Sequence, residues 1–141
     1  MTRAERPDCE RPDCERPDCE RPDWPTRLLG GVFIFTGVVH FLTPGTFDRI
    51  VPPGLPIRPR TATLVSGVAE VAGGVGLLLP AIRPAARLGL LALLIAVFPA
   101  NVYMAQQPQK FGVPAWVAWA RLPLQPLLFW WVLRAGRAGT T

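Results

Sequence analysis

Five of the polar side chains in the long apolar stretches of the chain could form a site, and such groups are costly to bury there. They are His40, Glu70, Asn101, Arg121 and Gln125. Glu70 is one of two acidic residues after residue 24, and it lies inside SGVAEVAGGVGLLLP, residues 66–80. A charged Asp, Lys or Arg at the centre of a membrane helix costs about 2.5–3.5 kcal/mol on insertion scales. A carboxylate in such a place indicates a functional site and requires a partner.

Arg121 is the partner that we predict for Glu70. Each residue lies eight positions from the start of its apolar stretch, which is about 12 Å deep at ~1.5 Å per residue. Both stretches begin on the same side of the membrane, so the depths match. A guanidinium group fits a carboxylate through two parallel hydrogen bonds. His40 and Asn101 lie nearer the same face and Gln125 lies one turn deeper, so we expect all five to form one ligand-binding site.

Three roles fit these residues. A Glu70–Arg121 pair can simply fix helix register in a small bundle, or the same residues can bind a ligand such as a quinone. The carboxylate can also serve a proton or cation pathway. A single histidine excludes haem held by two histidines, no metal-ligand spacing is present, and no catalytic residue is indicated. The pattern indicates no cofactor, although the pocket would admit a quinone.

Four apolar stretches must position these side chains, and they run over about 24–42, 62–79, 85–104 and 113–133. A helix of eighteen steps reaches ~27 Å, close to the ~30 Å core of a bilayer. Trp116 and Trp119 near one end of the last stretch, and Trp130 and Trp131 near the other, fit the aromatic belts of two membrane interfaces. The sequence therefore predicts an all-α membrane protein, a bundle of four transmembrane helices over residues 24–133 in the lipid bilayer.

Prolines and small residues indicate how these stretches are joined. Residues 43–60 contain five prolines and are predicted to form a loop, with a short turn at FDRIV. The turn at residues 80–84 makes an antiparallel hairpin, and Pro99 should kink the third helix by freeing the carbonyl of Ile95. Pairs of small residues four apart, Ala69 with Gly73 and Ala72 with Gly76, allow a neighbouring helix to approach closely.

The charge distribution supports a membrane protein. Charged residues make up 18% of the chain, against about 25% in an average soluble domain. Residues 1–24 hold five Arg and eight acids, and the other 117 hold ten basic residues against Asp48 and Glu70. These cations flank apolar runs and form no stripe, which excludes nucleic acid as a partner. Six arginines near span ends on the side of the termini, against four basic residues opposite, place both termini in the cytoplasm.

The N-terminal residues 1–23 are dominated by ERPDC repeats. Proline at every fifth position and alternating charge predict a disordered tail. Its three cysteines, Cys9, Cys14 and Cys19, are an odd number in a repeat and indicate no disulfide framework. Residues 134–141 are predicted to be a short basic tail.

Four motifs in order give the chain a familiar pattern. They are HF-x-x-P-x-x-F-x-x-I-x-P at residues 40–52, SG-x-x-E-x-x-GG-x-GLL-x-P at 66–80, VFPAN-x-YM at 97–104 and RLPLQ at 121–125. Over residues 28–133 the chain resembles the DoxX-like family of small bacterial membrane proteins. The resemblance implies a four-helix bundle in the bacterial inner membrane. It also implies an association with membrane redox complexes, since founders of that family accompany a thiosulfate–quinone oxidoreductase.

Three functions follow from these observations. The first is a non-enzymatic membrane subunit or small-molecule binding protein, alone, as a homo-oligomer or beside a redox partner protein. The second is a subunit of a quinone-linked oxidoreductase, although the apolar body has no cysteine pair and no dinucleotide motif. The third is a small proton-coupled transporter. Such transporters carry their essential carboxylate in the first span, whereas Glu70 lies in the second.

Overall fold

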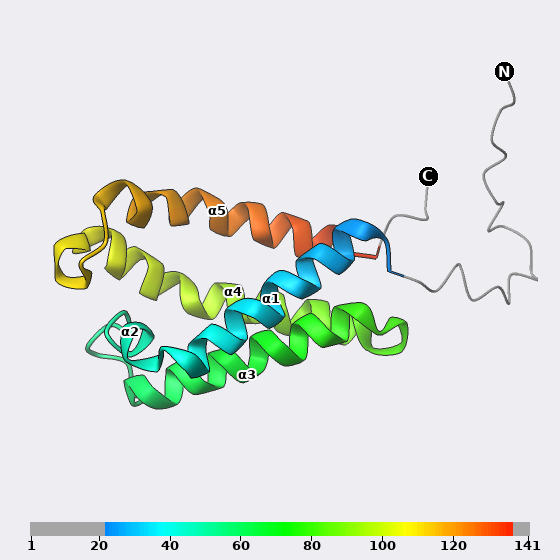
Figure 1. Cartoon of the computed structure of the whole chain (residues 1–141), viewed down its shortest axis with the longest axis horizontal. Coiled ribbons are helices and arrows are strands. Elements are labelled where there is room, and N and C mark those ends of the chain that lie inside the picture. The colour runs from blue at the N-terminus through cyan, green and yellow to red at the C-terminus, as the bar shows by residue number, and fades with distance from the viewer. Residues whose placement is uncertain (1–21, 137–141) are drawn as a thin grey trace, which may run out of the picture.

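A computed structural model describes residues 22–136, and these fold into helices and connecting loops without a strand. Four long helices form the body of the molecule (Figure 1). The elements in chain order are α1 (Trp24–Leu42), α2 (Pro44–Asp48), α3 (Pro59–Leu78), η1 (Pro80–Ile82), α4 (Arg83–Gln106), η2 (Pro108–Phe111) and α5 (Ala115–Arg134). The predictions for the repeat tail and for the last residues of the basic tail fall outside the described residues.

Proline sets the beginning of most helices. It occupies one of the first two positions of α1, α2, α3 and α4, where its missing N–H has no helical partner to lose. The proline-rich loop predicted for residues 43–60 is shorter than expected, because Pro44 starts α2 and Pro59 starts α3. Gly112 adopts a left-handed conformation with φ 64°, and this turn redirects the chain into α5.

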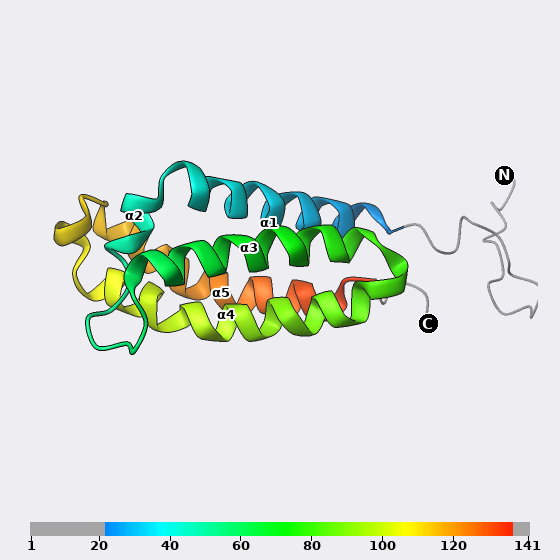
Figure 2. The ribbon, with the colours of Figure 1, turned by 90° about the horizontal axis from the view of Figure 1, so that it is seen from below.

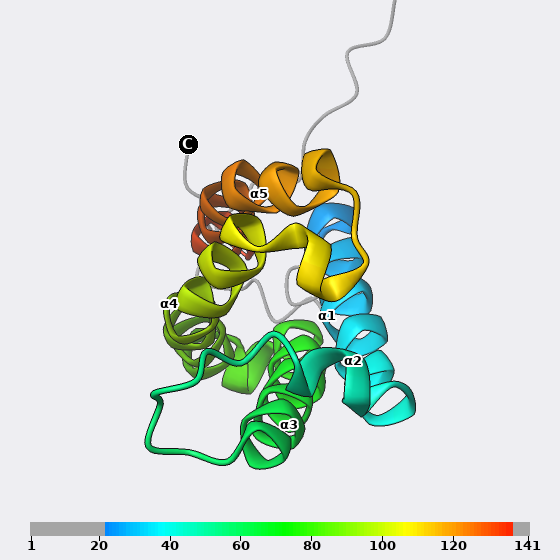
Figure 3. The same cartoon turned by 90° about the vertical axis from the view of Figure 1, so that its left-hand side faces the viewer.

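The four long helices form a ring in which sequential neighbours pack together. α1 lies on α3, α3 on α4, and α4 on α5. Seen from the end that carries α2, α5 and α1 occupy the fourth side of the ring (Figure 3), and these two helices lack a comparable mutual contact. At the end that carries the termini they meet, since the N–H of Gly136 donates to the hydroxyl of Thr26 at 3.1 Å.

The apolar core fills the terminal end of the bundle. Leu29, Leu77 and Val132 are fully buried there, and they form one cluster with Phe33, Leu90, Leu94 and Ala135. Two arginines of α4 complete this end. Arg83 donates to the carbonyl of Leu77 at 2.8 Å, and Arg87 donates to that of Val132 at 3.2 Å. Such bonds satisfy carbonyls that a helix end leaves without partners.

Glycines bring α1 and α3 into backbone contact along their length (Figure 2). A Cβ atom built on Gly30 would lie 2.9 Å from the carbonyl oxygen of Gly74, and one built on Gly37 would lie 2.8 Å from that of Gly67. Both helices therefore carry two contact glycines seven residues apart. The small residue pairs predicted on α3 face elsewhere, because a Cβ on Gly73 would meet Leu90 of α4.

Three of the predicted spans are long and apolar enough to cross a membrane, namely α1, α3 and the continuous segment Pro80–Gln106. Side chains that point away from the ring fit this setting, since Val68 is 57% exposed and Leu88 is 69% exposed. The protein is thus all-helical and suited to several passes through a lipid bilayer. The fourth predicted span forms α5 but does not meet the same measure of hydropathy, because it holds Arg121, Gln125 and two internal prolines.

Candidate functional site

A cavity of about 420 Å³ occupies the end of the bundle opposite the termini. Its wall draws side chains from α1, α2, the loop of residues 49–58, α3, α4 and α5, and most of them are apolar. All five polar residues singled out in the sequence border this one cavity: His40, Glu70, Asn101, Arg121 and Gln125. Residues that lie 81 positions apart in the sequence are thereby brought to the same space.

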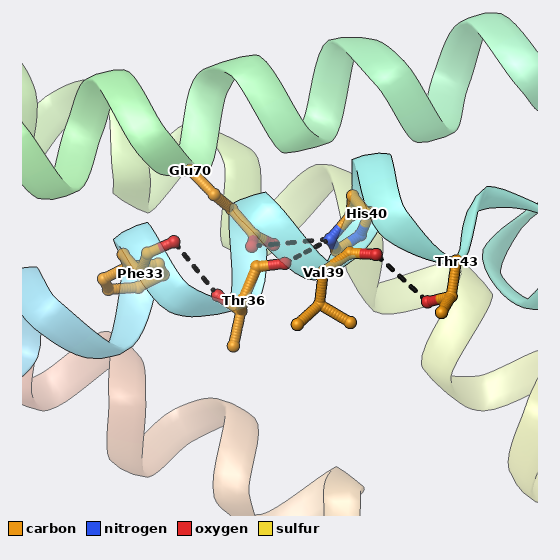
Figure 4. A network of polar contacts seen from close by, with 6 residues as sticks. All are labelled: Phe33, Thr36, Val39, His40, Thr43 and Glu70. Atoms are coloured by element: carbon orange, nitrogen blue, oxygen red, sulfur yellow. Dashed lines mark hydrogen bonds and ion pairs between the residues drawn. The ribbon is translucent and has the colours of Figure 1, made fainter.

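His40 and Glu70 form the most buried ionisable pair of the cavity (Figure 4). Their side chains are 12% and 13% exposed, and 3.7 Å separates Nδ1 of His40 from Oε2 of Glu70. Nδ1 also lies 2.9 Å from the carbonyl oxygen of Thr36. Because a carbonyl oxygen only accepts hydrogen bonds, Nδ1 carries a proton and donates it there. In the neutral ring, Nε2 is then an acceptor.

Glycines on both helices explain how His40 of α1 and Glu70 of α3 can come close together. Gly37 precedes His40 by three residues on α1, and Gly67 precedes Glu70 by three residues on α3. A Cβ on Gly67 would lie 2.9 Å from the Cβ of His40, so the two backbones touch one turn away from the pair. Residues three apart share a helix face. The repeated Gly-x-x-His and Gly-x-x-Glu spacing was therefore a readable signal for this pairing.

The expected ion pair between Glu70 and Arg121 is absent from the structure, and His40 takes the place of Arg121. Depth along the membrane normal placed Glu70 and Arg121 at the same level, but α1 rather than α5 is the helix packed against α3. Arg121 still lines the cavity, from the opposite wall, and it is exposed. Within residues 22–136 no hydrogen bond or ion pair holds its guanidinium group.

Asn101 and Gln125 join α4 to α5 at the edge of the cavity. Nδ2 of Asn101 donates to Oε1 of Gln125 at 2.7 Å, and Nε2 of Gln125 donates to the carbonyl of Leu94. The next carbonyl along the helix is that of Ile95, which has no helical hydrogen-bond partner because Pro99 lacks an N–H. Both amide side chains therefore have partners within the protein, which makes them a structural wall of the site.

Two buried oxygen atoms at the cavity, in contrast, have no hydrogen-bond partner within the described residues. Oε2 of Glu70 and Oγ1 of Thr63 are buried, and neither forms a hydrogen bond within the described chain. Thr63 is 3% exposed and borders the cavity. It lies seven residues before Glu70, on the same face of α3, and this spacing is the sequence signal for it. Buried polar atoms normally have partners, so these two oxygens are available to accept a hydrogen bond from water or from a ligand in the cavity.

The cavity is covered at its outer end by α2 and the loop after it. The ring of Phe47 stacks on that of His40, with centroids 3.8 Å apart and an interplanar angle of 21°. One residue further on, a carboxylate oxygen of Asp48 lies 3.5 Å from the guanidinium group of Arg60 on α3. These contacts hold the segment of residues 44–58 over the cavity, and we call this segment the cover.

The fold and the site together define an all-helical protein with three segments apolar enough to cross a membrane and a largely apolar, polar-edged cavity between its helices. The chain belongs to the family of DUF8561, a domain of unknown function, which matches it over residues 29–136. No curated protein and no solved structure matches the chain. The family description names neither a ligand nor a reaction, and the cavity is the feature of the fold that bears on function.

Proposed function

We propose that this protein binds a small molecule within the membrane, as a non-enzymatic binding protein or as the binding subunit of a larger complex. One observation carries the proposal. Polar side chains from four helices border a single cavity, and two of the buried oxygens there form no hydrogen bond within the described residues. A volume of about 420 Å³ also falls within the range of roughly 300–1,000 Å³ that is usual for ligand sites.

The chemistry of the wall suggests how a ligand would be held. A hydrogen-bond donor on the ligand would satisfy Oε2 of Glu70, with Thr63 beside the same space. An acceptor on the ligand would reach the guanidinium group of Arg121 across the cavity. The remaining wall would cover the apolar part of the molecule, which adds about 25 cal/mol for each Å² removed from water.

The membrane setting that we propose has four spans, with α5 as the fourth. Trp116 and Trp130 near its two ends are exposed and suit the two interfaces. Arg121 and Gln125 would face the cavity, where an internal polar residue is tolerated. We further propose that the termini lie in the cytoplasm of a bacterial inner membrane, in keeping with the positive-inside rule and the resemblance to DoxX-like proteins.

The alternative is a subunit of a quinone-linked oxidoreductase. The closeness of His40 and Glu70 favours it, because a proton donor and a carboxylate lie beside an apolar space that can hold a ring. In this case a separate redox partner protein would supply the electrons and the site would supply only the protons of the quinol.

The test is to identify what the purified protein carries. We would extract the protein from its membrane into lipid nanodiscs and analyse the bound small molecules by mass spectrometry, for the wild type, Glu70→Gln, Arg121→Gln and Arg134→Gln. Arg134 is a matched control, since it is an exposed arginine of the same helix outside the cavity. We expect a stoichiometric molecule in the wild type and in Arg134→Gln, and its loss in the other two variants.

Two outcomes would count against the proposal. One is the absence of any molecule beyond bulk lipid in every sample. The other is equal retention in all four proteins while their elution profiles and thermal stability are unchanged. If the molecule is a quinone, reduction by a co-purifying redox partner would favour the alternative. Uptake of a solute into proteoliposomes that depends on Glu70 would instead favour a transporter.

A further inference from the structure

The cavity is bounded by the core cluster, by the cover and by the space between α1 and α5. At the terminal end, the core cluster with Leu29 and Val132 fills the space between the helices. At the outer end, the cover forms part of the wall. Its side chains Phe47, Ile50, Val51, Pro52 and Leu55 all line the cavity, and the stack on His40 and the Asp48–Arg60 contact secure it.

The third side lies between α1 and α5. These helices meet at Thr26 and Gly136 and draw apart towards the cavity, where no extensive contact joins them (Figure 1). Outside the cover, five cavity-lining residues are exposed. One of them is Ala96 of α4, and the other four belong to α1 and α5. They are Val32 at 38%, Phe35 at 69%, Leu124 at 47% and the exposed Arg121. The cavity therefore reaches the lipid-facing surface between α1 and α5, and we call this place the side opening.

The charges at the cavity limit the kind of head group that fits. Glu70 contributes a carboxylate and Arg121 a guanidinium group, on opposite walls. A net anion would be attracted by Arg121 but repelled by the carboxylate of Glu70. A net cation would be attracted by Glu70 but repelled by the guanidinium group of Arg121. Burying either one leaves a charge that is incompletely paired, which is costly. A neutral head group with both donor and acceptor atoms meets both residues without this penalty.

We propose that the ligand is a neutral single-chain amphiphile, with a hydroxyl-bearing head group, that enters from the bilayer through the side opening. The head group donates a hydrogen bond to Glu70 and accepts one from Arg121, and the chain lies against the apolar wall and leaves between Phe35 and Leu124. This inference rests on the proposed function and adds to it the class of ligand and the route of entry.

The probe for this inference is a monoacylglycerol with a photoreactive diazirine in its chain, added to the full-length protein in nanodiscs. Labelled residues are mapped by mass spectrometry, with and without an excess of the unlabelled monoacylglycerol. We expect competable labelling of the side opening, at Val32, Phe35 and Leu124. Val68 and Val75 on the outer face of α3 are exposed but do not line the cavity, so their labelling should not be competed.

Two comparisons test the route and the head group separately. Val32→Trp narrows the side opening and should weaken saturable labelling about tenfold, the effect of losing roughly one well-placed contact. Val68→Trp is the matched control and should leave labelling unchanged. A fatty acid and an alkylamine with the same diazirine chain should each bind about tenfold more weakly than the monoacylglycerol.

Each result has a distinct meaning. Uniform labelling of all lipid-facing residues, or equal effects of Val32→Trp and Val68→Trp, would overturn entry through the side opening. Equal or stronger binding of the charged probes would overturn the neutral head group. In both cases saturable binding itself would persist and the proposed function would stand. Because the mapping on the wild type needs no variant, misfolding of Val32→Trp would not obscure the answer. If none of the three probes bound saturably, the inference would be overturned, and the co-purification experiment would decide the fate of the proposed function independently.

Discussion

Replacing Gly37 with alanine should separate α1 from α3 at the point where they carry the polar pair. A Cβ atom at this position would lie 2.7 Å from a methyl group of Val71, 2.8 Å from the carbonyl oxygen of Gly67 and 2.9 Å from the amide nitrogen of Val71. Two of these three atoms belong to the backbone of α3, and a backbone cannot turn aside as a flexible side chain can. The helices must therefore move apart by several tenths of an ångström.

The expected loss of stability is about 1–3 kcal/mol, the usual effect of forcing an extra methyl group into a close-packed contact. Gly31→Ala is the internal control, because a Cβ atom at this position, six residues earlier on α1, meets nothing within 4 Å. Alanine is the better helix former by about 0.5–1 kcal/mol. Gly31→Ala should therefore leave the free energy of unfolding unchanged or raise it slightly, whereas Gly37→Ala should lower it.

Reversible unfolding of the purified protein in mixed detergent micelles, with increasing amounts of a denaturing detergent, provides the measurement. The two midpoints are compared with that of the wild type at the same protein and lipid concentrations. If Gly31→Ala and Gly37→Ala shift the midpoint equally, the backbone contact between α1 and α3 does not hold these helices together. Val71→Ala should suppress only part of the Gly37→Ala defect, since it removes the nearest methyl group and leaves the two backbone atoms in place.

Three further predictions concern the contact between α4 and α5, the end of α5 and the cover. Gln125→Leu leaves the donor group of Asn101 without its acceptor, so the same unfolding assay should show a loss of about 1–3 kcal/mol. Adding Asn101→Leu should recover part of this loss, and a purely additive double variant would contradict the pairing. Arg87→Ala removes a side chain that donates to the last carbonyls of α5, with an expected loss of about 1–3 kcal/mol; an unchanged midpoint would show that water replaces it. His40→Ala removes the ring on which Phe47 stacks, so proteolysis within the cover should accelerate, and unchanged cleavage would argue against this contact.

The sequence predicts the helices well, because proline and hydropathy determine where each one begins and ends. The first span is predicted at residues 24–42 and observed as Trp24–Leu42, and the third extends by only two residues at each end. The cover is predicted less well. FDRIV is expected to form a short turn, and the N–H of Ile50 does donate to the carbonyl of Phe47 at 3.0 Å. The helix α2 is not expected, although Pro44 suits the first turn of a helix.

The composition of the site is also accessible from the sequence, but its pairing is not. Counting residues from a span end gives depth, and depth is enough to place His40, Glu70 and Arg121 at one end of the bundle. It says nothing about which helix turns its face towards which neighbour. That rotation is determined by the glycines at 37 and 67, which allow α1 rather than α5 to lie against the carboxylate. The matching Gly-x-x-His and Gly-x-x-Glu spacings of α1 and α3 are the sequence signal that pairs Glu70 with His40.

The contrast between the two ends of the bundle has a consequence for hydrogen exchange. Amide groups open with free energies that follow local packing, so densely packed segments exchange last. The first half of α1 and the second half of α5, which share the core cluster and the Thr26–Gly136 bond, should exchange only when the whole bundle opens. The second half of α1 and the first half of α5 border the cavity and should exchange through smaller, local openings. Each of these two helices would thus combine a rigid half with a breathing half, and a bound ligand would slow exchange in the breathing halves alone.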